Sequence, residues 1–210
     1  QAGNVFGNLG ITQVNVANPT PGAVLVRENS SVTQSGPWTT HGNTHVDAGV
    51  NPISLTQNGN VLAPLKIEGG STNVYENDTI EDYANWATGT TYLQAYAGGI
   101  LGGGDIILDS AGNVLGSLQV IANNVTIVEN HDITDVSDWD ASGDVVLNAG
   151  TSSINLDQIG NVLGPIDIDG NPSDVTLYES DTITQAGAWD IGTAPITLNS
   201  RTNAISLLES

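Results

Sequence analysis

The sequence predicts an all-β protein: a right-handed parallel β-helix (β-solenoid) of about eight coils of ~25 residues, arranged as double repeats. Three observations predict this fold. A short motif recurs along the whole chain, short alternating apolar strands lie between its copies, and turn residues separate the strands. We therefore expect residues 1–210 to form a single β-solenoid domain, either an excerpt of a longer solenoid or a unit that stacks head to tail.

The recurring motif runs from Thr or Asp through a short polar turn to an anchor residue, and an apolar residue precedes each complete copy. The anchor is alternately Val and Trp, so the repeating unit is a double repeat of about fifty residues built from two similar coils. The anchors are Val5, Trp38, Val61, Trp86, Val114, Trp139, Val162 and Trp189.

The repeat also predicts how the strands pair. A strand must satisfy its backbone N–H and C=O groups with a neighbour. Because the same pattern returns in each coil, the neighbour is expected to be the equivalent strand of the next coil, in parallel, on a right-handed path. The anchors are expected to stack at one corner, with large Trp rings and small Val side chains interdigitating in the core. The alternative is that the four Trp side chains are exposed contacts.

The composition excludes several classes of partner. The formal net charge is -20, with only three Lys and Arg residues, and such acidity repels nucleic acids and anionic lipid surfaces. No apolar run reaches the ~20 residues of a membrane helix, so no membrane insertion is expected. The chain has no cysteine, which excludes disulfides and thiolate metal sites.

Two segments depart from the repeat. Extra residues fall around 15–23, and a glycine-rich apolar segment at 97–104 extends the coil that contains Trp86. Binding residues are often placed on loops that leave a regular scaffold. A module that binds glycans or host or biofilm surfaces through these loops is therefore an alternative function, and simple variation in loop length is the other interpretation.

Three runs of residues resemble a known family. Ile-Thr-Gln-Ala-Gly-Ala-Trp (183–189), Ile-Thr-Leu-Asn (196–199) and Gly-Asn-Val-Leu-Gly-Pro (160–165) are similar to repeats of bacterial filamentous haemagglutinin-like adhesins. The resemblance implies a secreted protein, extracellular or on the bacterial cell surface, that forms the shaft of a fibre or adhesin. It implies no catalytic residues. Terminal coils of a solenoid normally carry polar caps, and none is apparent in the sequence, so end-to-end stacking of the chain with itself is expected unless the chain is an excerpt of a longer one.

One acidic turn occurs once per double repeat and is the best candidate for a metal site. Carboxylate oxygens are hard ligands that suit Ca²⁺, and these turns are expected to lie on one edge of the solenoid, two coils or ~10 Å apart. The alternative is a structural turn whose polar side chains satisfy their own backbone, with no cofactor. The calcium candidates are Glu28, Glu76, Asp78, Glu129, Asp132, Glu179 and Asp181.

The sequence does not predict an enzyme. A catalytic site breaks the symmetry of a repeat, whereas the acidic motifs here obey it. His41 and His45 are four residues apart, but outside a helix that spacing does not place them on one face. His131 lies in another coil. A polysaccharide-degrading enzyme is therefore the third hypothesis, after a structural shaft and a glycan-binding module.

Overall fold

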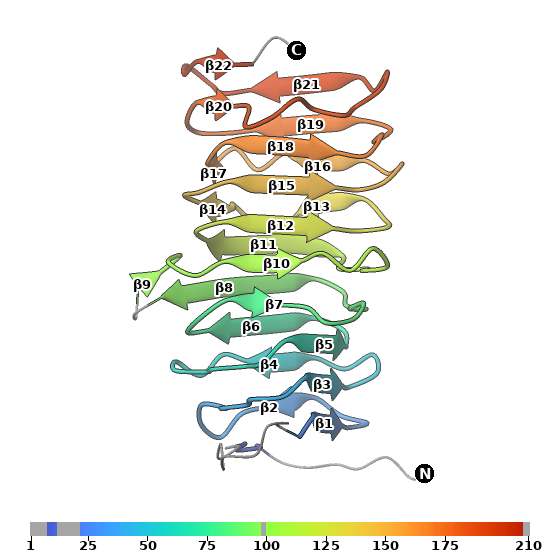
Figure 1. The fold of residues 1–210 in the computed structure, drawn as a ribbon, viewed down its shortest axis with the longest axis vertical. Coiled ribbons are helices and arrows are strands. Elements are labelled where there is room, and N and C mark those ends of the chain that lie inside the picture. Colours follow the sequence, from blue (N-terminus) through green and yellow to red (C-terminus); the bar gives the residue numbers. More distant parts are fainter. Residues whose placement is uncertain (1–7, 12–21, 98–99, 208–210) are drawn as a thin grey trace.

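The computed structural model describes residues 8–11, 22–97 and 100–207. In this part of the chain the regular secondary structure consists of β-strands, which wind into a parallel β-solenoid of about nine turns (Figure 1). In Figure 1 the strands in front run to the right and those behind run to the left while the chain rises, so the winding is right-handed. The predicted fold class is confirmed. The described residues contain no helix that could cross a membrane.

One face of the solenoid is a continuous sheet, which we call the long sheet. Each of its strands pairs in parallel with the equivalent strand of the next turn, and three short strands lie beside this path. The path is β2 (Val32–Thr33), β4 (Ile53–Leu55), β6 (Thr72–Glu76), β8 (Thr91–Ala97), β11 (Ser117–Ala122), β13 (Ile133–Asp135), β16 (Ile154–Leu156), β19 (Val175–Tyr178) and β21 (Ile196–Asn199); beside it are β9 (Ile100–Leu101), β14 (Asp140–Ala141) and β17 (Val162–Leu163).

The opposite face consists of shorter sheets that follow one another along the solenoid. Parallel bridges from Leu65 to Asp82 and from Ile166 to Gln185 join them. The strands are β1 (Val24–Arg27), β3 (Thr44–Asp47), β5 (Leu65–Glu68), β7 (Ile80–Glu81), β10 (Ile106–Leu108), β12 (Val125–Val128), β15 (Val145–Asn148), β18 (Ile166–Asp169), β20 (Ile183–Thr184) and β22 (Ile205–Ser206).

One turn of the solenoid is shorter than the repeat motif predicts. Val24 pairs with Thr44, and Thr44 pairs with Leu65, so successive turns there take 20 and 21 residues. The expected coil of ~25 residues was the spacing of the anchors and not the length of a turn. The chain therefore has about nine turns, where about eight were expected.

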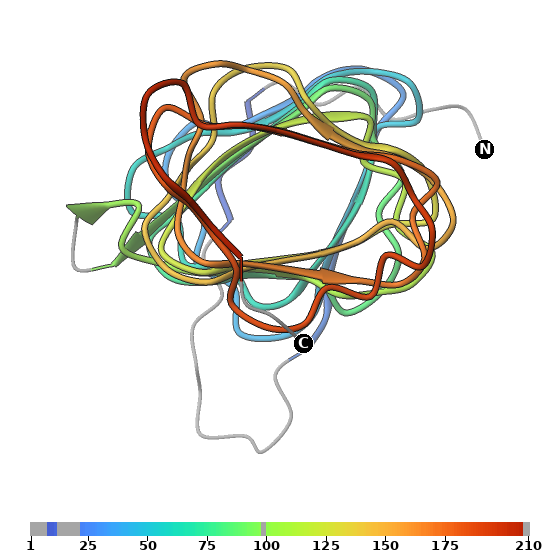
Figure 2. The same ribbon diagram turned by 90° about the horizontal axis from the view of Figure 1, so that it is seen from above.

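The two faces meet at two corners, seen end on in Figure 2. Corner 1, where the chain leaves the long sheet, holds two anchor pairs in which the Val backbone N–H donates a hydrogen bond to the Trp backbone carbonyl of the turn below. The Val61 N–H donates to the Trp38 carbonyl, and the Val162 N–H donates to the Trp139 carbonyl, both at 2.9 Å. Corner 2, where the chain enters the long sheet, holds the pair Trp86 and Val114 in the same arrangement, and also Trp189.

The expectation that all anchors stack at one corner is therefore wrong. Trp38 and Trp86 are 48 residues apart, which corresponds to about two and a half turns of 20 residues. The half turn moves each successive Trp–Val pair to the opposite corner. Val5, the first anchor, lies outside the described residues.

The core is a single column of apolar side chains along the solenoid axis. Alternate residues of each strand point inward, as in Val74 of β6 and Leu93 of β8, which are fully buried. Trp38, Trp86 and Trp139 are also fully buried, so these three belong to the core, and Trp189 is partly buried. Three of the four Trp side chains are therefore not exposed contacts.

Candidate functional site

The corners bury polar side chains as well as tryptophan. Thr39 bridges to Val61, Ala87 to Val114 and Asp140 to Val162. Because side chains alternate in direction, the residues just before these bridges point inward. They are Trp in one turn and Asn in the next, so Asn and not Val stacks on Trp38, Trp86 and Trp139. Val61 and Val162 are 39% and 38% exposed, and the predicted interdigitation of Trp and Val is therefore wrong.

Each corner contains four residue types in a repeating arrangement that we call the corner cluster. It consists of the Trp anchor, a Gln or Asp four residues before it, the buried Asn of the next turn, and a Glu from the turn after that. The complete clusters among the described residues are Gln34, Trp38, Asn60 and Glu76; Asp82, Trp86, Asn113 and Glu129; and Asp135, Trp139, Asn161 and Glu179.

The Asn is the central residue of each cluster and is fully buried. Asn161 Oδ1 accepts the Trp139 backbone N–H at 2.7 Å, and its Nδ2 donates to Asp135 Oδ2 at 2.8 Å. Asn113 bonds in the same way to Trp86 and Asp82. Each Asn thus satisfies buried polar groups that a hydrophobic residue of the same size would leave unpaired.

The acidic partner of the Asn holds the following turn. Asp135 Oδ1 and Oδ2 accept the backbone N–H groups of Asp157 and Gln158 at 3.1 and 2.9 Å. Burial raises the pKa of Asp135, and the hydrogen bond from Asn161 and those backbone N–H groups oppose the rise. The carboxylate therefore holds the polar residues that precede the Val162 anchor against the solenoid turn below them.

The Glu of each cluster is buried with one oxygen unpaired. Oε1 of Glu76, Glu129 and Glu179 accepts a Leu backbone N–H at 2.7, 2.6 and 2.7 Å, whereas Oε2 is buried without a hydrogen-bond partner. Burial raises the pKa of Glu76 to about 9 and that of Glu129 and Glu179 to about 7, although the backbone hydrogen bond opposes the rise. A protonated carboxyl would leave no uncompensated charge there.

These contacts show that the predicted calcium turns lie at two corners of the solenoid. Glu76 and Glu179 bond to backbone at corner 1, and Glu129 bonds at corner 2, so the expectation of one shared edge is wrong. The candidate aspartates lie nearer the surface. Asp132 Oδ1 accepts the Ser153 N–H at 2.8 Å, Asp181 Oδ1 accepts the Thr182 N–H at 2.7 Å, and Asp78 is exposed. In the first of the predicted acidic turns, Glu28 is 5% exposed and accepts a hydrogen bond from Ser30.

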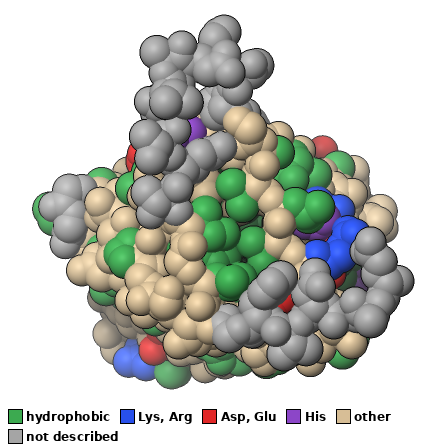
Figure 3. Space-filling view, turned by 90° about the horizontal axis from the view of Figure 1, so that it is seen from below, with side chains coloured by type: hydrophobic (Ala, Val, Ile, Leu, Met, Phe, Trp, Pro, Cys, Tyr) green, Lys and Arg blue, Asp and Glu red, His purple; other side chains and the backbone are tan. Residues whose placement is uncertain are grey.

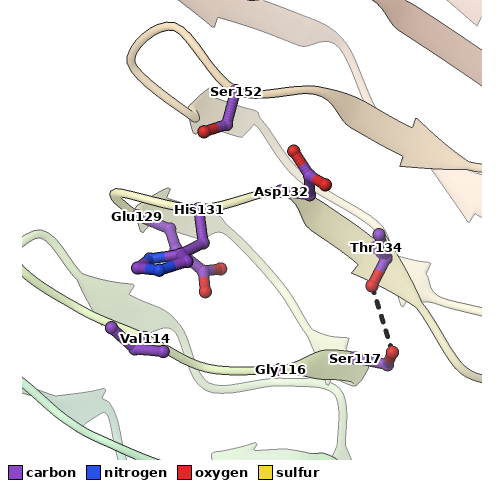
Figure 4. Close-up of a pocket in the computed structure, with 8 residues that line it drawn as sticks. All are labelled: Val114, Gly116, Ser117, Glu129, His131, Asp132, Thr134 and Ser152. Atoms are coloured by element: carbon purple, nitrogen blue, oxygen red, sulfur yellow. Dashed lines mark hydrogen bonds between the residues drawn. The ribbon is translucent and has the colours of Figure 1, made fainter.

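A surface hollow of about 510 Å³ lies beside Glu129 at corner 2 (Figure 4). Three successive turns line it, and the Thr134 hydroxyl donates to Ser117 Oγ at 3.1 Å across two of them. Its other polar lining residues include His131, Asp132 and Ser152. The hollow could accept hydrogen bonds or a positive charge, but within residues 8–11, 22–97 and 100–207 no three His, Cys, Asp or Glu side chains are grouped to hold a metal ion.

The remaining sequence candidates lie elsewhere. His45 Nε2 is 2.7 Å from Glu68 Oε2 on adjacent strands, and Lys66 also contacts this Glu68 carboxylate. The 97–104 segment contains β9, which pairs antiparallel with the end of β8. Most of the predicted 15–23 loop falls outside the described residues.

Thermal unfolding can test whether calcium binds at the corners. Because the corner carboxylates already accept backbone hydrogen bonds, we expect equal melting temperatures in millimolar calcium and in magnesium at the same ionic strength. Both salts should raise the melting temperature over chelator alone, since ions screen the repulsion of a chain with a net charge of -20. A rise that is specific to calcium would show a calcium site.

The buried Asn was not recognised as a site residue from the sequence. The sequence does contain a pattern that marks this Asn, because Gly-Asn precedes each of three Val anchors, at 59–61, 112–114 and 160–162. An Asn beside a Gly is typical of an exposed turn. Only the strand register shows that its side chain points inward.

Comparison with known proteins identifies the family of the chain. A family model described as repeats of unknown function (DUF5649) matches residues 2–67 and 103–168, together more than half of the chain. The two segments begin 101 residues apart, which is also the separation of Trp38 and Trp139, the two Trp anchors of corner 1. No curated protein and no solved structure matches the chain.

Proposed function

The chain belongs to the family of repeats of unknown function DUF5649, and from this premise we propose that it is a non-catalytic segment of the shaft of an extracellular fibre or adhesin. The observation that carries the proposal is the corner cluster. Its buried polar side chains bond mainly to backbone and to one another, and they repeat at both corners. Such groups tie each turn to the next, which is what a rigid rod requires.

The end surfaces support assembly of the chain with itself. At the upper end, Ile196 and Ile205 are 40% and 46% exposed, although they are in register with the fully buried Val175 and Ile183 of the previous turn. At the lower end, hydrophobic side chains gather in the middle of the face (Figure 3). We propose that the upper end of one copy stacks on the lower end of the next, a head-to-tail contact that repeats without closing.

Electron microscopy and sedimentation at high protein concentration test this assembly. One solenoid of about nine turns is about 40 Å long, and we expect rods that are multiples of this length. An Ile196→Asp/Ile205→Asp variant should remain monomeric, because it places two charges in the proposed contact. Val136→Asp is the matched control, since Val136 is 38% exposed and lies between β13 and β14, several turns from both ends. A monomeric wild type, or rods formed equally well by the double variant, would contradict the proposal.

A further inference from the structure

The outer face of the long sheet carries a cluster of three tyrosines on two neighbouring strands. Tyr75 lies on β6, and Tyr92 and Tyr96 lie on β8. All three are half-buried, whereas the alternate residues of the same strands, such as Val74 and Leu93, are fully buried in the core. The tyrosines therefore point away from the core. We propose that this face binds a neutral polysaccharide chain.

Amide side chains lie beside the tyrosines in the strand register. Tyr92 is in register with Asn73 of β6 and with Gln119 of β11, and Tyr75 is in register with Gln94 of β8. Residues paired in this way have Cβ atoms about 5 Å apart. The rings and amides thus form one contiguous surface across three strands, on a scaffold that is pinned by backbone pairing.

The fold itself does not require tyrosine at these positions. In other turns the same two outward columns hold residues other than tyrosine: Ser54 is in register with Asn73 in the column of Tyr92, and Ile121, Asp140 and Val162 follow Gln94 in the column of Tyr75. The tyrosine cluster is therefore a local departure from the repeat. Exposed aromatic residues that the scaffold does not need are candidates for binding.

A second departure from the repeat adjoins the cluster. The antiparallel strand β9 pairs Leu101 with Tyr96, and Ile100 and Leu101 are 70% and 48% exposed. β9 projects to the left of the solenoid in Figure 1. It places apolar side chains beside the end of the tyrosine surface, where they would extend the area available to a ligand.

The chemistry of the surface favours an uncharged, hydroxyl-rich ligand. The outward residues of β6, β8 and β11 within the cluster carry no charge, although the chain has a formal net charge of -20. Tyr, Asn and Gln side chains both donate and accept hydrogen bonds, as sugar hydroxyls do. The flat faces of the rings suit the apolar faces of sugar rings. An acidic polysaccharide would be repelled by the surrounding carboxylates, and a basic partner would find no charge within the cluster to pair with.

Affinity electrophoresis of the purified chain in gels that contain neutral polysaccharides, such as β-glucan, xylan or mannan, tests the proposal. We expect retention in at least one neutral polysaccharide and none in polygalacturonate. A Tyr75→Ala/Tyr92→Ala/Tyr96→Ala variant should bind at least about tenfold more weakly, because it loses three ring contacts. Tyr178→Ala is the matched control, since Tyr178 is half-buried on β19 of the same sheet but outside the cluster.

A second variant keeps the test informative if the triple variant is unstable. Tyr92→Phe retains the ring and should retain most of the binding, whereas Tyr92→Ala should not. The proposal is overturned if no neutral polysaccharide retains the chain, if Tyr178→Ala loses as much binding as the triple variant, or if only a protein ligand binds. Retention and rod formation are separate measurements, so failure of one leaves the other proposal standing.

Discussion

Raising the pH from about 5 to about 8 is expected to lower the free energy of unfolding by several kcal/mol. Burial raises the pKa of Glu76 to about 9 and that of Glu129 and Glu179 to about 7, above the ordinary value of 4.5. The folded state therefore holds protons that the unfolded chain releases. The stabilisation is fully present below pH 4.5 and is lost as the pH rises through 7 and then 9. Glu129 and Glu179 each account for on the order of 3 kcal/mol.

Urea denaturation at several pH values measures this effect, and two Gln variants control it. Glu129→Gln should flatten the decline, because an amide stays neutral and can still accept the Leu115 N–H. Glu68→Gln should not flatten it. Burial raises the pKa of Glu68, but hydrogen bonds from His45 and Lys66 outweigh burial and hold it below 4.5. A group with a lowered pKa loses its contribution as the pH falls, which is the opposite direction. Parallel pH profiles for wild type and Glu129→Gln would contradict the prediction.

Replacing Asn161 by Leu is expected to cost on the order of 3–5 kcal/mol of stability. Leu branches at the same carbon as Asn but is larger, and it cannot accept the Trp139 backbone N–H or donate to the Asp135 carboxylate. Both groups are buried, so the substitution leaves an unpaired donor and a charge that has lost a partner. The loss should appear in chemical denaturation near pH 7 as a lower midpoint.

Asn155→Leu is the matched control, because Asn155 lies on the neighbouring strand β16 and its side chain is only half-buried. We expect its cost to be within about 0.5 kcal/mol of zero. Combining Asn161→Leu with Asp135→Asn should recover part of the loss, since the second change removes the charge while its amide oxygen can still accept a backbone N–H of the following residues 157 and 158. If Asn161→Leu costs no more than Asn155→Leu, the corner cluster does not stabilise the solenoid as described.

Glu129 shows how the sequence of a turn can suggest an exposed position for a side chain that the structure buries. Glu129 follows a strand and precedes Asn-His-Asp, and in the sequence this is typical of an exposed acidic turn. In the structure its side chain lies inside the corner and bonds to the Leu115 backbone. Side chains along a strand point alternately towards the core and towards solvent. Whether a Glu at the end of a strand points inward depends on which residues of that strand face the core, and the sequence of the turn does not determine this.

The amino-acid sequence by itself determined that the chain is a parallel β-solenoid. Short alternating strands that recur at a regular interval leave parallel stacking as the way to satisfy the backbone and bury the apolar faces. Spacing along the chain was enough for this conclusion, because it depends on the recurrence of the pattern and not on its exact register.

Only the tertiary structure decided the length of a turn, the two alternating corners and the inward position of Asn60, Asn113 and Asn161. These features depend on which residue of one turn faces which residue of the next. A shift of one residue would exchange the inward and outward side chains, so that Val61 would be buried and Asn60 exposed. Backbone hydrogen bonds between turns select one register, and that choice is a property of the folded chain.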